Sequence, residues 1–148
     1  MLHTVVIALG SNLGDRRYHL RRAVHALGAF MRVVRVSAIR ETAPVGTPPG
    51  SPHFLNMVVA GYTTLTPHEL LEGLLAIESR LGRTRRGVRN EPRVIDLDLI
   101  LHGAHRVRSA RLTLPHPRYR GRRFVMEPLA EVTAFPSPSP TPPPHAHA

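Results

Sequence analysis

The chain has 148 residues, which is the size of one domain and enough to bury a core without disulfides. It contains no cysteine, and this excludes disulfide frameworks, thiolate-bound zinc, iron–sulfur clusters and thiol catalysis. All 20 basic residues are arginine, and there are 10 acidic residues, which gives a net charge of +10. This charge indicates either a polyanionic partner or a bias toward arginine codons. Because the chain has no lysine, a P-loop is excluded.

The N-terminal segment has the pattern of a strand rather than of a membrane or export signal. Its apolar run, Val5–Leu9, is far shorter than the roughly 20 residues that a membrane span requires. Residues Met1–Gly10 also lack the basic and apolar regions of a signal peptide. We therefore expect a cytoplasmic protein without a membrane partner.

The first predicted elements are a strand and a helix. The β-branched run Thr4–Leu9 predicts the strand, and Gly10-Ser11-Asn12 predicts a turn that ends it. Asp15 can cap a helix that runs to about Gly28, because apolar residues recur at helical spacing on one face of this segment. The opposite face of the helix is covered by arginines, namely Arg16, Arg17, Arg21 and Arg22.

Two strands separated by a long loop come next. Alternating side chains predict a strand over Met31–Glu41, and the apolar segment Phe54–Thr63 predicts another. Residues 43–52 hold four prolines and two glycines, a composition typical of a loop.

The second predicted helix has a strong start signal. Thr66-Pro67-His68-Glu69 is a capping box with proline at the first helical position, and apolar spacing extends the helix to about Leu81. Gly82–Pro92 then predicts an arginine-rich loop, and Val94–Leu101 predicts the strand that follows.

The C-terminal part adds smaller elements and a tail. Arg106–Thr113 predicts a further strand or hairpin, and Arg123–Val132 a short helical piece. The proline-rich sequence from Ala134 onward cannot pack as helix or sheet, so we expect one domain over 1–132 and a disordered tail over 133–148. The order β-α-β-β-α-β predicts an α+β, ferredoxin-like core with an antiparallel or mixed sheet, helices packed on it and long mobile loops.

Two aspartates share one face of the last predicted strand. Because side chains alternate along a strand, Asp96 and Asp98 point the same way, roughly 7 Å apart. Neighbouring carboxylates repel each other unless a cation offsets their charge, and hard oxygen ligands suit Mg²⁺. The pair therefore indicates a two-metal phosphoryl-transfer site, although two unrelated acids on a solvated face are the alternative.

The loop before these aspartates carries positive charge that such a site needs. Arginine side chains can neutralise a triphosphate together with metal when no Walker motif is present. The proline-rich and arginine-rich loops could also close over the site and exclude water. The arginines in question are Arg83, Arg85, Arg86, Arg89 and Arg93.

Six short motifs follow one another along residues 5–132. They are Val6-Ile7-Ala8-Leu9-Gly10-Ser11-Asn12-Leu13-Gly14-Asp15, Thr42-Ala43-Pro44-Val45-Gly46, Phe54-Leu55-Asn56, Arg93-Val94-Ile95-Asp96-Leu97-Asp98-Leu99-Ile100, Leu112-Thr113-Leu114-Pro115-His116-Pro117-Arg118 and Arg122-Arg123-Phe124-Val125. Together they resemble the motifs of the 6-hydroxymethyl-7,8-dihydropterin pyrophosphokinase family, folate-pathway enzymes that move diphosphate from ATP to a pterin alcohol. The resemblance implies ATP as co-substrate and two Mg²⁺ ions as cofactors.

The resemblance also implies a pterin site. Asn56 would read the amide edge of the pterin, and Phe54 and Phe124 would stack on its ring. Thr42, Pro44 and Val45 would line the same site. An isolated phenylalanine is also compatible with simple core packing, whereas a buried amide needs hydrogen-bond partners.

The nucleotide and the metal would bind next to the pterin. Asp96 and Asp98 would hold both Mg²⁺ ions, and Arg93 and Arg83 would stabilise the transferring group as catalytic residues. The contacts with ATP would come from Glu78, Arg85, Leu99, Arg111, Thr113, His116 and Arg122. From the residues alone, Glu78 could instead pair with a neighbouring arginine, and His116 could be a loop histidine without a role.

Two other functions fit part of the sequence. A ferredoxin-like fold with a net charge of +10 could be an RNA-binding module, but aromatic residues make up only 5% and the aspartate pair would repel RNA. A catalytically weak relative could use the same site only to bind pterin or nucleotide. We expect small-molecule substrates, no nucleic-acid partner, and a monomer, since neither predicted helix has an unmatched apolar face.

Overall fold

The computed structural model describes residues 1–43, 46, 48–82 and 94–117. The elements in this part, in chain order, are β1 (His3–Ser11), α1 (Arg16–Leu27), β2 (Arg32–Val36), β3 (Arg40–Thr42), β4 (Phe54–Thr63), α2 (Pro67–Arg80), β5 (Asp96–His102), β6 (Val107–Arg108) and β7 (Thr113–Leu114). The helical piece predicted over Arg123–Val132 and the predicted tail over 133–148 lie outside the described residues, so the division into domain and tail stays a prediction.

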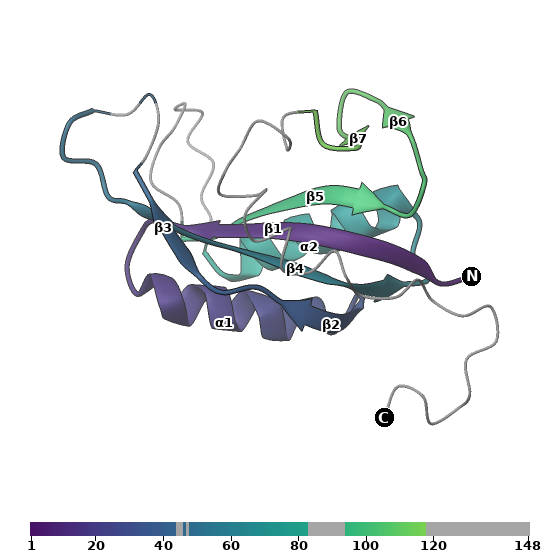
Figure 1. Ribbon diagram of the computed structural model, residues 1–148, viewed down its shortest axis with the longest axis horizontal. Coiled ribbons are helices and arrows are strands. Elements are labelled where there is room, and N and C mark those ends of the chain that lie inside the picture. The colour runs from purple at the N-terminus through teal and green to yellow at the C-terminus, as the bar shows by residue number, and fades with distance from the viewer. Residues whose placement is uncertain (44–45, 47, 83–93, 118–148) are drawn as a thin grey trace.

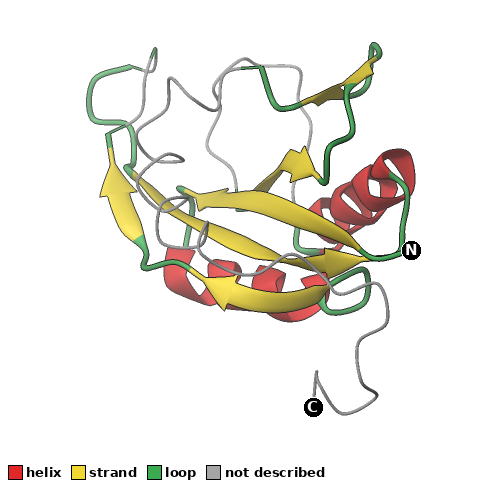
Figure 2. Ribbon diagram, turned by 45° about the vertical axis from the view of Figure 1, so that its right-hand side comes forward, coloured by secondary structure: helices red, strands yellow, loops and turns green. Residues whose placement is uncertain are grey.

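An antiparallel sheet forms the centre of the molecule (Figure 1). Its strand order is β2-β4-β1-β5, and β3 also pairs with β4. The longest pairing joins β1 to β4, from His3 opposite Thr63 to Ser11 opposite Leu55. Figure 2 shows both helices on one face of this sheet. The predicted α+β class, with helices packed on an antiparallel sheet, is therefore confirmed.

The hydrophobic core lies between the sheet and the two helices. Alternate residues of the three central strands point toward α1 and α2, and each large aliphatic side chain buried there stabilises the fold by about 1.5–3 kcal/mol. These residues include Val5, Ile7, Leu9, Leu20, Leu27, Leu70, Leu74, Ile77, Leu97 and Leu99. The other face of the sheet holds a smaller buried cluster of Val6, Ala8, Val58, Ala60 and Ile100.

Both helices begin at the caps that the sequence predicts. The Asp15 carboxylate accepts a hydrogen bond from the Tyr18 amide at 3.2 Å, and α1 ends at Gly28. At α2 the Thr66 hydroxyl accepts from the Glu69 amide and the Glu69 carboxylate accepts from the Thr66 amide, at 3.2 and 2.8 Å. Neither of these two helices is both long and apolar enough to cross a membrane.

Three of the predicted strands have different bounds in the structure. The strand predicted from Val94 begins only at Asp96. The turn predicted at Gly10-Ser11-Asn12 is not where β1 ends, because Gly10 and Ser11 still pair with β4 and this pairing outweighs the local turn propensity.

The strand predicted over Met31–Glu41 is split into β2 and β3. The break contains Ser37, whose amide donates to the Val58 carbonyl while its hydroxyl accepts from the Val58 amide, both at 2.9 Å. The serine side chain thus takes the place of a backbone acceptor, and the chain bends between the two strands. The predicted strand or hairpin over Arg106–Thr113 is present as the β6–β7 hairpin.

Candidate active site

A row of paired residues crosses the sheet on the face opposite the helices. Arg40 of β3 pairs with Asn56 of β4, Asn56 pairs with Gly10 of β1, and Gly10 pairs with Asp96 of β5. Residues that lie directly opposite each other in an antiparallel pair point to the same face. With strands about 4.8 Å apart, the α-carbons of Asn56 and Asp96 are about 10 Å apart. This polar row places a cation, an amide, bare backbone and a carboxylate side by side.

Gly10 leaves the space that its neighbours in the polar row occupy. A β-carbon at this position would lie 3.2 Å from Asn56 Oδ1 and 3.4 Å from the Phe54 ring. A side chain at this position would crowd the Asn56 amide, which would have to move by a few tenths of an ångström. Our sequence reasoning did not assign Gly10 to the site, although a glycine inside an apolar strand is a known signal for close approach.

The predicted pterin residues that the structure describes lie together. Asn56 is 5% exposed, and its Nδ2 donates to Thr42 Oγ1 at 2.7 Å. Thr42 in turn pairs with Phe54 across β3 and β4. This bond fixes the orientation of the amide. Pro44, Val45 and Phe124 lie outside the described residues.

A set of contacts around Glu41 ties down the chain next to these residues. Arg16 at the start of α1 lies 3.7 Å from the Glu41 carboxylate, and His53 Nδ1 lies 3.4 Å from it. Arg16 also donates to the His53 carbonyl at 2.8 Å. Glu41 and His53 are the neighbours of Thr42 and Phe54, so the network holds both ends of the intervening loop beside Asn56. The sequence reasoning missed this network because its members are far apart in the chain.

The aspartate pair lies where the strand alternation predicts. Asp96 and Asp98 are half-buried, and their neighbours Leu97 and Leu99 point into the core on the other face. Asp96 pairs with Gly10 and Asp98 with Ala8. Small residues of β1 therefore lie beside both carboxylates. The donor set, two carboxylates and no thiol, fits a hard cation such as Mg²⁺.

Glu78 has a contact that the sequence did not predict. This glutamate of α2 is only 3% exposed, and its Oε2 accepts a hydrogen bond from the Leu97 amide at 2.8 Å. Leu97 lies between the two aspartates, so the carboxylate anchors β5 at that point. Burying a carboxylate is costly unless it is hydrogen-bonded, which indicates that this anchor matters to the site.

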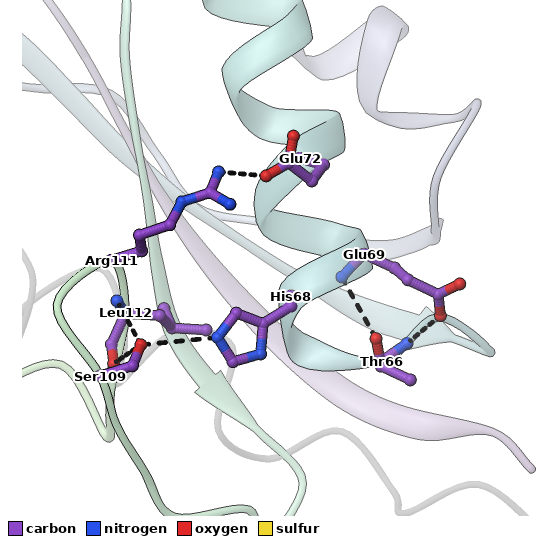
Figure 3. A network of polar contacts seen from close by, with 7 residues as sticks. All are labelled: Thr66, His68, Glu69, Glu72, Ser109, Arg111 and Leu112. Atoms are coloured by element: carbon purple, nitrogen blue, oxygen red, sulfur yellow. Dashed lines mark hydrogen bonds and ion pairs between the residues drawn. The ribbon is translucent and has the colours of Figure 1, made fainter.

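The other residues predicted to bind ATP lie in different parts of the structure, and some lie outside the described residues. The Leu99 side chain is in the core, and Thr113 is half-buried in β7. The His116 amide donates to the Ile100 carbonyl at 3.0 Å, which brings this histidine alongside β5 near Asp98. Arg111 pairs with Glu72 of α2, as Figure 3 shows. Arg83, Arg85, Arg93 and Arg122 lie outside the described residues.

Fold and site together define a class, namely an α+β protein that presents an aspartate pair and an oriented amide on one face of an antiparallel sheet. The model of the 7,8-dihydro-6-hydroxymethylpterin-pyrophosphokinase family matches residues 6–134. The chain therefore belongs to the 7,8-dihydro-6-hydroxymethylpterin-pyrophosphokinase family.

Comparison with individual proteins agrees with this family. The chain is 48% identical over 134 residues to the 2-amino-4-hydroxy-6-hydroxymethyldihydropteridine pyrophosphokinase of Bacillus subtilis (strain 168), covering 89% of this chain and 79% of that protein. It is 42% identical over 129 residues to a folate synthesis bifunctional protein of Arabidopsis thaliana, covering 86% of this chain but only 26% of the larger protein.

A solved structure shows the same fold. The crystal structure titled as an HPPK-DHPS in complex with substrates matches with a TM-score of 0.65 at 13% identity. The match covers 89% of this chain and 40% of that one.

Proposed function

We propose that this chain transfers diphosphate from ATP to the hydroxymethyl group of 6-hydroxymethyl-7,8-dihydropterin and releases AMP, as a step of folate biosynthesis. The family and the names of its relatives support this activity. The single structural observation that carries it is the polar row, in which Asn56 and Asp96 lie on the same face of the sheet, on either side of Gly10. The amide that would read the pterin and the carboxylate that would hold a metal thus lie on one face of the sheet, about 10 Å apart between their α-carbons.

The pterin would bind at the amide end of the polar row. A pterin edge offers a donor and an acceptor side by side, and an amide side chain matches both. The bond from Asn56 Nδ2 to Thr42 holds the amide in one orientation before the substrate arrives. Phe54 would stack on the ring, with Phe124, Pro44 and Val45 completing the site.

Asp96 and Asp98 would hold two Mg²⁺ ions at the other end of the polar row. Bound there, Mg²⁺ would neutralise the charge of the triphosphate. The carboxylates lie on a strand that Glu78 anchors from the opposite face, so their positions are set before the nucleotide binds. His116, which lies along β5, is within the region where a phosphate chain would extend.

The reaction asks the protein mainly for positioning and charge. The hydroxymethyl oxygen forms a bond to the β-phosphorus, the bond between that phosphorus and the oxygen shared with the α-phosphate breaks, and AMP leaves while the alcohol proton passes to water. Arg93 and Arg83 would stabilise the oxygens of the transferring group. Glu78, Arg85, Leu99, Arg111, Thr113 and Arg122 would contact ATP as the family resemblance implies. Leu99, whose side chain is in the core, would do so through its backbone. For Arg111 the contact requires that its ion pair with Glu72 opens.

A coupled assay of AMP release tests the reaction. AMP should appear only when ATP, Mg²⁺ and the pterin alcohol are all present. AMP release without the pterin, or no release with it, would contradict the proposal. Binding of both substrates without turnover would identify a catalytically weak relative instead.

A variant of Gly10 tests the site. Gly10→Ala should raise the KM for the pterin about tenfold, because the new β-carbon crowds the Asn56 amide and shifts it by a few tenths of an ångström. The matched control is Gly28→Ala, since Gly28 lies outside the site with a helical φ of −58°. An unchanged KM in the Gly10 variant would place the pterin elsewhere.

We also propose that the protein acts as a cytoplasmic monomer on these small molecules and does not bind nucleic acid. Size-exclusion chromatography with light scattering tests the monomer. Salt-dependent binding of a short RNA would contradict the last part of this proposal.

A further inference from the structure

Three histidines meet at the end of the sheet that lies away from the aspartate pair. His3 begins β1, His102 ends β5, and His105 follows in the next turn. Their ring centroids are 4.9–5.0 Å apart, and one nitrogen from each ring lies within 4.8 Å of the others. Figure 1 shows the end of β5 beside the start of β1, close to the N-terminus. Six residues of extended strand, about 20 Å, separate His102 from Asp96.

The central ring of the histidine cluster is held in one protonation form. His102 is 1% exposed, and its Nε2 lies 2.8 Å from the Leu65 carbonyl. A carbonyl oxygen only accepts, so Nε2 carries the hydrogen and Nδ1 of the neutral ring carries the lone pair. Metal-binding histidines are commonly arranged this way, with one nitrogen bonded to a backbone carbonyl and the other directed at the ion.

The unprotonated nitrogen of His102, Nδ1, is directed at the rest of the histidine cluster. His102 Nδ1 lies 3.2 Å from His105 Nδ1, which also lies 3.0 Å from the His102 carbonyl. Without a cation, the His105 N–H can donate to both of these acceptors. Burial lowers the pKa of His102 and of His3, in the direction of the neutral ring that can act as a ligand.

The backbone makes the turn between His102 and His105 stiff. The His105 amide donates to the His102 carbonyl at 3.0 Å, and the Gly103 amide donates to the Thr4 carbonyl at 2.6 Å. The second bond ties the turn directly to β1, next to His3. His105 is exposed and His3 half-buried, so one side of the histidine cluster is accessible to a cation and to water.

We propose that His3, His102 and His105 form a binding site for a zinc-type divalent cation, with water as the fourth ligand. Three imidazoles without a thiol or carboxylate suit Zn²⁺ far better than Mg²⁺. With Zn–N distances of about 2.0–2.1 Å, tetrahedral ligand atoms lie about 3.4 Å apart. The 3.2 Å between His102 Nδ1 and His105 Nδ1 is already close to this value, so it is the His3 ring, within 4.8 Å of the others, that moves inward on binding. The cation would cross-link the start of β1 to the end of β5.

Calorimetric titration with Zn²⁺ tests the site. The starting protein is the full chain with His145→Ala and His147→Ala, because these two tail histidines could bind metal by themselves. One Zn²⁺ should bind per chain, and Co²⁺ should give the visible spectrum of a tetrahedral site. His105→Ala and His3→Ala should each weaken binding by more than about 100-fold, beyond the loss typical of a residue that only supports a ligand.

His25→Ala is the matched control, because His25 is an exposed histidine on α1 and should leave zinc binding unchanged. The exposed His105 is preferred over the buried His102 for the test, since its loss leaves the fold intact. Zn²⁺ should also raise the unfolding temperature of the parent but not of the His105 variant. No binding by the parent, or equal binding by the parent and the His3 and His105 variants, would overturn the proposal.

Discussion

The two faces of the sheet differ in chemistry although the same strands make both. On the face toward the helices, β5 presents Leu97 and Leu99 to a continuous apolar core. On the other face, the same strand presents Asp96 and Asp98 beside Gly10 and Ala8. A shift of β5 by one residue would bury both carboxylates and expose both leucines. The hydrophobic core therefore specifies the position of the aspartates as strongly as it specifies the fold.

The largest expected effect comes from the aspartate pair, on the face of the sheet away from the helices. Asp98→Asn should lower kcat about a thousandfold, equivalent to about 4 kcal/mol, because one of the two charges that we propose hold the metal is lost. The unfolding temperature should stay within a few degrees of the parent, since the side chain is not part of the core. Near-normal turnover at saturating Mg²⁺ would remove the aspartate pair from the mechanism.

A substitution at the neighbouring position of β5 should instead lower stability and leave kcat largely unchanged. Leu97→Ala should lower the free energy of unfolding by about 2–5 kcal/mol, because it leaves a cavity between the sheet and the helices. Urea denaturation measures this loss. The folded fraction should keep most of its kcat, and a catalytic loss as large as that of Asp98→Asn would mean that the two faces are not separable.

Glu78 accepts a hydrogen bond from the backbone of Leu97, between the two aspartates. Its variants should show whether it stabilises the fold or contacts the nucleotide. Glu78→Ala should cost about 1–3 kcal/mol of stability, because the buried Leu97 amide loses its acceptor. Glu78→Gln keeps an acceptor oxygen and should recover most of that stability. If the Gln variant instead raises the KM for ATP at full stability, Glu78 contacts the nucleotide directly.

The smallest effect lies at the start of α2, where the exposed Glu69 completes the helix cap. The pKa of Glu69 is lowered because its carboxylate accepts the Thr66 backbone amide and interacts with the Thr66 side chain. The unfolded state therefore binds more protons between the lowered pKa and the ordinary value of 4.5, so the stabilisation is present above that range and is lost as the pH falls through it. Glu69→Gln should be slightly less stable than the parent at pH 7.

Urea denaturation across the acid range checks this expectation. The difference between Glu69→Gln and the parent should disappear on acidification. A difference that persists in acid would mean that the charge of Glu69 does not contribute through the cap.

Local sequence patterns were sufficient for much of the fold. The two helix starts were predictable because a cap depends on residues three positions apart, as at Asp15 and at Thr66. The common face of Asp96 and Asp98 was predictable because strand alternation needs no partner. The order of the short motifs was enough to indicate the family.

Contacts between distant segments were not predictable in this way. Gly10 and Ser11 read locally as a turn, and only their pairing with β4 makes them strand. The anchoring of Leu97 by Glu78, the pairing of Arg111 with Glu72 and the network around Glu41 each join separate elements.

The histidine cluster shows most clearly that contacts between distant segments cannot be predicted from local patterns. A single histidine in a strand or a turn has no local pattern that marks it as a ligand, and His3 is about a hundred residues from the other two. Periodicity and capping report interactions within one element, and these set which residues form helices and strands and which side of each is apolar. Which polar side chains end up as neighbours depends on how the strands pair in space, and that was decided by the tertiary packing of the sheet against its helices.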